Sequence, residues 1–221
     1  MLRYISISLL LLISLASWSQ TIVKEQSSVN QGITVGVNLA GLVNRIIDND
    51  RTGISFLSRV NLNSNLFVAA EAGYENVSFE KSAYNYFSNG TFFKIGLEKD
   101  MLPDKEKGTN DNILIGLRYG FALQEQGSDY FFVENGYWDD YSGRLGTNTL
   151  NTHWLELSAG PRAELFKNVY MSWGMHFRVA VATSNTSIME PYIIPGFGSG
   201  DKRVNLGFSY SIEYMIPWNR K

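Results

Sequence analysis

Residues 204–216 read VNLGFSYSIEYMI, and this stretch decides the fold class of the 221-residue chain. Large apolar or aromatic side chains occupy every second position from Val204 to Ile216, while Asn, Gly, Ser and Glu fill the positions between them up to Glu213. Successive side chains of a β-strand point to opposite faces of the sheet. The stretch therefore predicts a strand with one wholly apolar face and one face that is polar or very small.

The same alternation recurs seven times along the chain. Residues 112–123 and 169–182 repeat it cleanly, and the weaker copies are residues 32–40, 53–62, 66–75, 91–98 and 153–162. These lengths are close to the ~9–11 residues that a tilted strand needs to cross a bilayer. Between the strands we expect one helical turn at most, within residues 42–47. The expected fold class is all-β: an eight-stranded antiparallel up-and-down transmembrane β-barrel.

The connections between these strands alternate in length. The long connections are residues 41–52, 76–90, 124–152 and 183–202. The short connections are residues 63–65, 99–111 and 163–168. Outer-membrane barrels have long extracellular loops at one end and short periplasmic turns at the other. We expect the same arrangement here.

The composition excludes several classes of function. The chain has no cysteine, which excludes disulfides, thiolate metal sites and a catalytic cysteine. Its formal charge of −2 leaves no basic excess for binding nucleic acid. Aromatic residues make up 14% of the chain and charged residues only 18%, which favours a β-rich protein over a disordered one.

Residues 1–19 have the features of a signal peptide. Arg3 supplies a positive charge, residues 5–15 form an apolar run, and Ser17 and Ser19 are small residues suited to cleavage. The run is shorter than the ~20 residues of a spanning helix, which favours a signal peptide over a retained anchor. Residues 20–31 are then expected to be a short periplasmic segment and residues 32–221 the barrel.

Two kinds of barrel fit the alternation, because a soluble lipocalin-like barrel places its apolar face inside and a membrane barrel places it outside. The composition of the face that is polar or very small favours the membrane barrel. Its acidic and basic side chains are equal in number and are separated by Gly, Ala and Ser, which suits a narrow lumen filled by paired charges. The expected lumen network is Arg59, Glu71, Glu75, Lys94, Glu98, Arg118, Glu156, Arg162, His176, Arg178 and Glu213.

The longest connection is rich in aromatic residues interleaved with Gly and acidic residues. Tyr and Trp are common on recognition surfaces, so this loop is a candidate site for a partner or glycan. The alternative is an extension of the barrel strands whose aromatic rings pack on one another. The candidate recognition residues are Tyr130, Phe131, Phe132, Tyr137, Trp138 and Tyr141. The last loop, with EPYIIPGFG at residues 190–198, is too apolar for free solvent and is expected to fold over the rim or dock on a neighbour.

Catalysis and metal binding have little support in the sequence. His153 follows Glu134, Asp139 and Asp140, an arrangement that could serve a rim enzyme, meaning an enzyme with its active site at the loop end of the barrel. The sequence fixes no serine and no water-activating pair beside His153. The loop acids lack the alternate spacing of a calcium loop. We therefore expect no catalytic residue, no cofactor and no metal.

Four segments carry a resemblance to a known family. They are GITVGVNL at residues 32–39, LFVAAEAGYE at 66–75, IGLRYGF at 115–121 and YIIPGF at 192–197. With them, nearly all of the mature chain resembles a small outer-membrane barrel family of Bacteroidetes-type bacteria that is catalogued as a domain of unknown function. The resemblance implies an eight-stranded barrel in the outer membrane of a Gram-negative bacterium, and it brings no catalytic or ligand residues.

The leading functional hypothesis is a non-enzymatic outer-membrane barrel without a pore, with a structural or interaction role carried by its loops. Its expected partners are outer-membrane lipids and no nucleic acid. The alternative is an accessory barrel subunit of a larger envelope complex for assembly or export. Less favoured hypotheses are a rim enzyme that uses His153 and a narrow channel.

Overall fold

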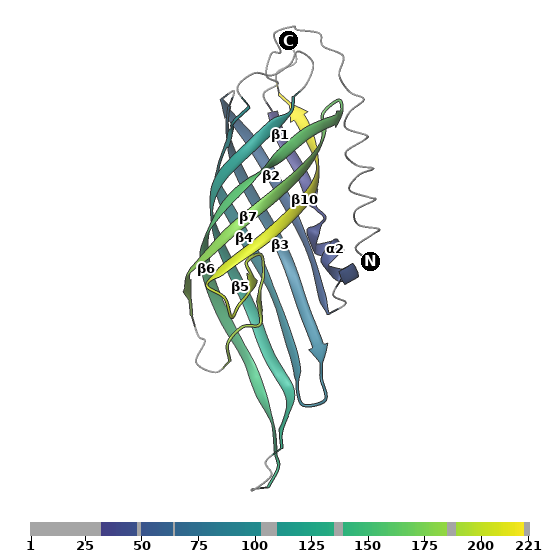
Figure 1. Ribbon diagram of the computed structural model, residues 1–221, viewed down its shortest axis with the longest axis vertical. Helices are drawn as coiled ribbons and strands as arrows, with labels where there is room; N and C mark the ends of the chain where they lie inside the picture. The colour runs from purple at the N-terminus through teal and green to yellow at the C-terminus, as the bar shows by residue number, and fades with distance from the viewer. Residues whose placement is uncertain are drawn as a thin grey trace, which may run out of the picture. The chain divides into compact units, whose positions relative to one another are not determined.

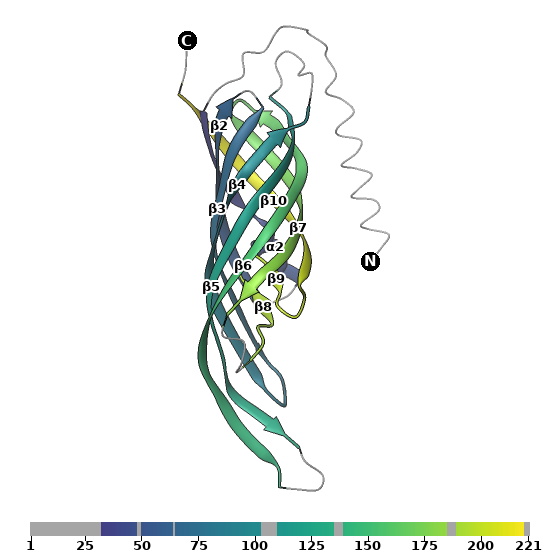
Figure 2. The same ribbon diagram turned by 90° about the vertical axis from the view of Figure 1, so that its left-hand side faces the viewer.

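The computed structural model of the chain describes residues 32–47, 50–63, 65–102, 110–134, 139–184 and 189–218. Eight antiparallel strands close into one barrel, in which each strand pairs with its neighbours in the chain and the first strand pairs with the last (Figures 1 and 2). The predicted fold class, an all-β eight-stranded antiparallel barrel, is confirmed. The strands are β1 (Gly32–Asn38), β2 (Arg51–Asn63), β3 (Leu66–Glu80), β4 (Asn85–Asp100), β5 (Asn112–Val133), β6 (Tyr141–Phe166), β7 (Val169–Thr183) and β10 (Val204–Pro217).

The predicted signal peptide, residues 1–19, and the segment 20–31 lie outside the described residues. Among the residues that are described, no helix combines the length and the apolar character that crossing a membrane requires.

The two faces of the strands differ as the alternation predicts. Outward side chains are large and apolar: Leu117 is 59% exposed and Phe208 is 74% exposed. Inward side chains on β5 and β10 are ionic: Arg118 is 7% exposed and Glu213 is 1% exposed. The barrel therefore has its apolar side chains outside and its charged side chains inside.

Two of the predicted loops are largely strand, which corrects the sequence analysis. Residues 76–90 form a continuation of β3 and β4 around a tight connection, and residues 124–152 are mostly the long ends of β5 and β6. The two hairpins join where Tyr84 pairs with Phe131 and the amide of Phe132 donates to the carbonyl of Ala83 at 2.7 Å. We call this projecting part of β3–β6 the extension (Figure 1).

The alternation did not predict the extension because its strands lack one apolar face. Gln124, Gln126 and Ser128 face inward there, and all three are buried. Ladder hydrogen bonds between the backbones of paired strands do not need an apolar face. The hairpins therefore continue beyond the last apolar side chain that the pattern detects.

Helix α2 (Ala40–Ile47) connects β1 to β2 and is longer than the single turn expected. The side chain of Asn38 accepts a hydrogen bond from the amide of Ala40 at 3.0 Å, which satisfies a free donor at the helix start. Gly41 allows the helix to approach β2 closely, because a side chain at this position would collide with the backbone of Gly53. The helix is thereby held against the loop end of β2.

The last loop folds back into the mouth of the barrel, in agreement with the prediction that it covers the rim. It forms the small hairpin β8 (Ile193–Ile194) and β9 (Gly198–Ser199), which Figure 2 places at the loop end of the barrel. Ile194 and Phe197 are 2% and 0% exposed and pack with Trp154, Phe92 and Ala122. This apolar cluster closes the loop end of the lumen.

Candidate functional site

The interior of the barrel contains a connected network of buried ion pairs. Glu213 of β10 accepts hydrogen bonds from Nη1 of Arg59 at 2.6 Å and from Nε of Arg162 at 2.9 Å. Nε of Arg59 donates to Glu98 at 2.6 Å, and Glu98 also binds Arg118. These side chains come from strands β2, β4, β5, β6 and β10, so the network joins opposite walls of the barrel.

Glu156 of β6 is the most highly connected member of the network and has no exposed surface. Its carboxylate lies 2.8 Å from Nε of Arg178, 3.3 Å from Nζ of Lys94 and 3.3 Å from Nη1 of Arg118. Nδ1 of His176 lies 3.1 Å from the same carboxylate. Because three cations and one histidine converge on it, this carboxylate compensates more buried charge than any other described group.

Burial makes these pairs mutually dependent. Removing an ion from water costs several kcal/mol, and only close opposite charges with good hydrogen bonds offset that cost. The middle of the lumen has little free space: two cavities beside Arg59, Arg118 and His176 measure about 10 and 20 Å³. Volumes of this size hold about one water molecule each. The charges in the middle of the lumen therefore have each other as partners and very little water beside them.

Ten of the eleven predicted lumen residues belong to this network. They are Arg59, Glu71, Lys94, Glu98, Arg118, Glu156, Arg162, His176, Arg178 and Glu213. The eleventh, Glu75, lies nearer the loop end, where it pairs with Arg51 and accepts a hydrogen bond from the amide of Gly196 at 3.1 Å. It thereby ties the β8–β9 hairpin to the barrel wall.

Two inward-facing charged residues were missed by the sequence analysis. The alternation places Arg51 in the connection at residues 41–52 and Asp100 in the connection at residues 99–111. Asp100 is 3% exposed and accepts hydrogen bonds from the side chain of Asn112 at 2.6 Å and from the amide of Ile113 at 3.1 Å. Arg51 lies on the same face of its strand as Arg59, and Asp100 lies on the same face as Lys94. Extending each predicted strand by two residues would therefore predict both side chains to face the lumen.

His153 does not meet the acidic residues that would make a rim enzyme. Nδ1 of His153 is within hydrogen-bonding distance of the hydroxyl of Tyr119, and its ring lies 5.0 Å from that of Phe121. Asp140 lies 13 residues earlier on the same chain, beyond the far end of β6, which is about 40 Å away along an extended strand. Within the described part of the chain, no group of His, Asp and Glu side chains could hold a metal ion.

The four predicted recognition residues that the structure describes lie on the extension. Tyr141 is 63% exposed and Tyr130 is 44% exposed, while the rings of Phe131 and Tyr141 are 5.8 Å apart. Phe132 is half-buried near the same tip, and its amide joins the two hairpins. Tyr137 and Trp138 lie outside the described residues. The rings of Phe131 and Tyr141 thus lie in contact, as the strand-extension alternative expected.

A second aromatic cluster lies on the β3–β4 half of the extension, where the sequence analysis had placed a loop. The ring of Phe79 lies 5.9 Å from Tyr84, 5.3 Å from Tyr86 and 5.2 Å from Tyr192. Nζ of Lys81 lies 5.4 Å above the ring of Phe79, a cation–π contact. The cluster fixes the last loop against the extension, because Tyr192 belongs to that loop.

The structure thus defines a class of protein: a closed β-barrel of eight strands with paired charges inside and apolar side chains outside. The chain belongs to the DUF6048 family, a domain of unknown function, whose match covers residues 1–221. Membership of a domain-of-unknown-function family agrees with the resemblance seen in the sequence, while the Bacteroidetes origin stays a prediction. No curated protein matches the chain.

Two solved barrels are similar to this chain. Ail, the attachment invasion locus protein of Yersinia pestis, is 10% identical with a TM-score of 0.41, and the match covers 84% of this chain and 96% of Ail. A major outer membrane protein from Thermus thermophilus is 9% identical with a TM-score of 0.46, and the match covers 84% of this chain and 98% of that protein.

The central position of Glu156 gives a stability prediction. The substitution Glu156→Gln keeps the volume but leaves Lys94, Arg118 and Arg178 without their shared counter-charge. We expect it to lower the free energy of unfolding in lipid vesicles by about 3–5 kcal/mol, measured by urea titration. The control Glu80→Gln removes an exposed carboxylate on the extension and should change the same quantity by less than about 0.5 kcal/mol. Equal effects of the two substitutions would contradict the role given to the network.

Proposed function

We propose that the protein is an outer-membrane barrel, closed along its axis, that serves a structural or interaction role through its extension. The observation that carries the membrane placement is the outward apolar face. One row of paired residues crosses five neighbouring strands on this face, and each of its side chains is between 45% and 73% exposed. The row consists of Leu97, Leu117, Leu157, Phe177 and Leu206. An apolar surface of this breadth on a soluble protein would be an aggregation hazard, whereas lipid chains cover it in a membrane.

The contents of the lumen support a barrel that is not a porin. The ion network fills the middle, and the cluster of Trp154, Ile194 and Phe197 covers the loop end. At the turn end the guanidinium of Arg162 lies 3.6 Å from the ring centre of Tyr170, which is 1% exposed. Eight strands enclose a space that side chains can fill, unlike the wide barrels that conduct solutes.

The extension supports an interaction role at the end of the barrel where the long connections lie. β7 accompanies β6 only from Thr152 onward, so residues 141–150 of β6 project beyond the barrel wall together with β5. Tyr130, Val133 and Tyr141 all present more than 40% of their surface there. Exposed Tyr side chains on a rigid sheet offer contact area at a low entropic cost. In this proposal the extension faces the outside of the cell and the short turns face the periplasm.

Membrane placement can be tested by charge substitution on the outward face. Leu117→Arg puts a charge in the middle of the apolar belt, and Val133→Arg puts the same charge on the extension. We expect Leu117→Arg to lower the free energy of unfolding in lipid vesicles by about 2–4 kcal/mol. Val133→Arg should stay within about 0.5 kcal/mol of the unsubstituted protein. Equal tolerance of the two substitutions would contradict a lipid-facing belt.

The interaction role can be tested by photocrosslinking in intact cells. A benzoylphenylalanine at Tyr141 samples the tip of the extension, and the same residue at Phe166 samples an equally exposed aromatic position at the turn end. We expect crosslinked products from position 141 that are several times more abundant than those from position 166. Products from position 166 alone, or none from either position, would contradict an interaction role for the extension.

A further inference from the structure

The wall of the barrel is incomplete near its loop end. β1 pairs with β2 and with β10 only as far as Asn38, which stands between Ser55 and Ser211, and the amide of Leu39 then donates to the carbonyl of Tyr210 at 2.7 Å. Beyond this point β2 continues through residues 51–54 and β10 through 204–209 with no β1 residue between them. Helix α2 lies against the β2 side of this gap.

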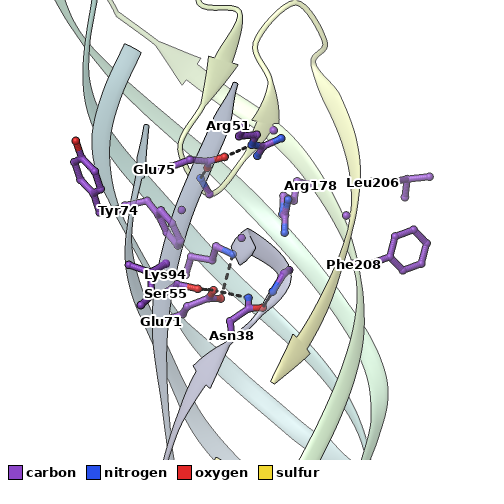
Figure 3. A pocket seen from close by; sticks show the side chains of 18 residues that line it. Asn38, Arg51, Ser55, Glu71, Tyr74, Glu75, Lys94, Arg178, Leu206 and Phe208 are labelled. Carbon is purple, nitrogen blue, oxygen red and sulfur yellow. Dashed lines mark hydrogen bonds and ion pairs between the residues drawn. The ribbon is translucent and has the colours of Figure 1, made fainter. Parts of the chain in front are cut away.

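A cavity of about 300 Å³ occupies the gap (Figure 3). The residues that line it include Ser55, Lys94 and Arg178, whose side chains point inward, and Leu206 and Phe208 of β10, whose side chains point away from the lumen. The cavity lies where no β1 residue stands between β2 and β10, so it is bounded there by the edges of two unpaired strands. It therefore opens sideways, toward the surroundings of the apolar belt.

Arg178 lies on the inner wall of the cavity, beside the opening. Nε of Arg178 donates to Glu156 at 2.8 Å and Nη1 donates to the carbonyl of Phe197 at 3.1 Å, so the guanidinium is held in place. It lies against Gly207 of β10, where a Cβ atom would come within 2.7 Å of Nη1. The absence of a side chain at position 207 thus gives the guanidinium its place beside the opening.

More cations than carboxylates line the cavity, because Glu156, which pairs with Arg178 and Lys94, is not part of its lining. The ionic side chains that line it are Arg51, Lys94 and Arg178 against Glu71 and Glu75. Nζ of Lys94 lies 3.1 Å from Glu71 deep in the cavity, and Arg51 pairs with Glu75 at the rim. A guanidinium offers five donors in one plane, a geometry that suits phosphate or carboxylate oxygens.

Apolar side chains flank the cavity on the outside of the barrel. Ile54 is 43% exposed on the β2 side, and Leu206 and Phe208 are 73% and 74% exposed on the β10 side. An alkyl chain leaving the cavity between these strands would continue along the belt that we place in lipid. The cavity holds the volume of about ten water molecules, enough for a compact head group with the first carbons of a chain.

We propose that this lateral cavity binds one anionic amphiphile from the membrane. Arg178 and Arg51 hold its phosphate or carboxylate head, and its chain passes out between Ile54 and Leu206. The proposal rests on the membrane placement proposed above, which the Leu117→Arg experiment tests separately. A loss of binding with intact placement therefore counts against this site alone.

Native mass spectrometry of the full chain released from nonionic detergent tests the proposal. The probes are dodecyl phosphate, dodecyltrimethylammonium and inorganic phosphate, each added at the same concentration. We expect a single adduct of dodecyl phosphate, at least about tenfold more populated than the adduct of either comparison probe. Binding of dodecyltrimethylammonium to the same extent would overturn the anionic site. Equal binding of inorganic phosphate would overturn entry by an amphiphile.

Two variants and one control complete the test. Arg178→Gln removes the charge at the opening, and Gly53→Leu fills the cavity from β2, where a Cβ atom has no contact closer than 3.3 Å. Each should reduce the dodecyl phosphate adduct about tenfold. Arg144→Gln removes an exposed cation on the extension and should leave the adduct unchanged. Because Gly53→Leu keeps every charge, an unchanged adduct in that variant would overturn the site even if Arg178→Gln proved unstable.

Discussion

The pairing of buried charges inside a narrow barrel is the constraint on which the rest of this structure depends. Glu156 receives Lys94, Arg118 and Arg178, and Glu213 receives Arg59 together with a second arginine from β6. Each ion is tolerated only because its partners come from other strands at the correct register. The network therefore stabilises one closed arrangement of the eight strands and leaves the apolar side chains no place but the outside.

The loop end differs from the middle of the barrel both in what fills the lumen and in what forms the wall. There the ionic network gives way to the apolar cluster around Phe197, and Glu75 anchors the hairpin that carries it. The wall also changes, because β1 stops at Asn38 and α2 takes its place beside β2. The same few loop-end segments thus close the barrel along its axis and leave an opening through its wall. A solute path along the axis is blocked, whereas the proposed lipid path through the wall is open.

Most of the fold could be predicted from the sequence because a period of two is a local property. The strand from Val204 to Pro217 shows the pattern within itself, and the inward phase of Arg118 or Glu156 follows from it. The extension, α2 and the gap could not be predicted in this way. They depend on where strand pairing starts and stops, and that depends on neighbours far away in the chain, as the bridge between Tyr84 and Phe131 illustrates.

The measurement that tests the central claim most directly is a depth profile along β5. Because the chain has no cysteine, single cysteines at residues 113–121 can each carry a spin label in lipid vesicles. We expect labels at odd-numbered positions to be accessible to oxygen dissolved in lipid and inaccessible to a water-soluble nickel chelate, with the largest difference near position 117. Labels at even-numbered positions should be inaccessible to both. Free access of the chelate to the odd-numbered positions would contradict this account.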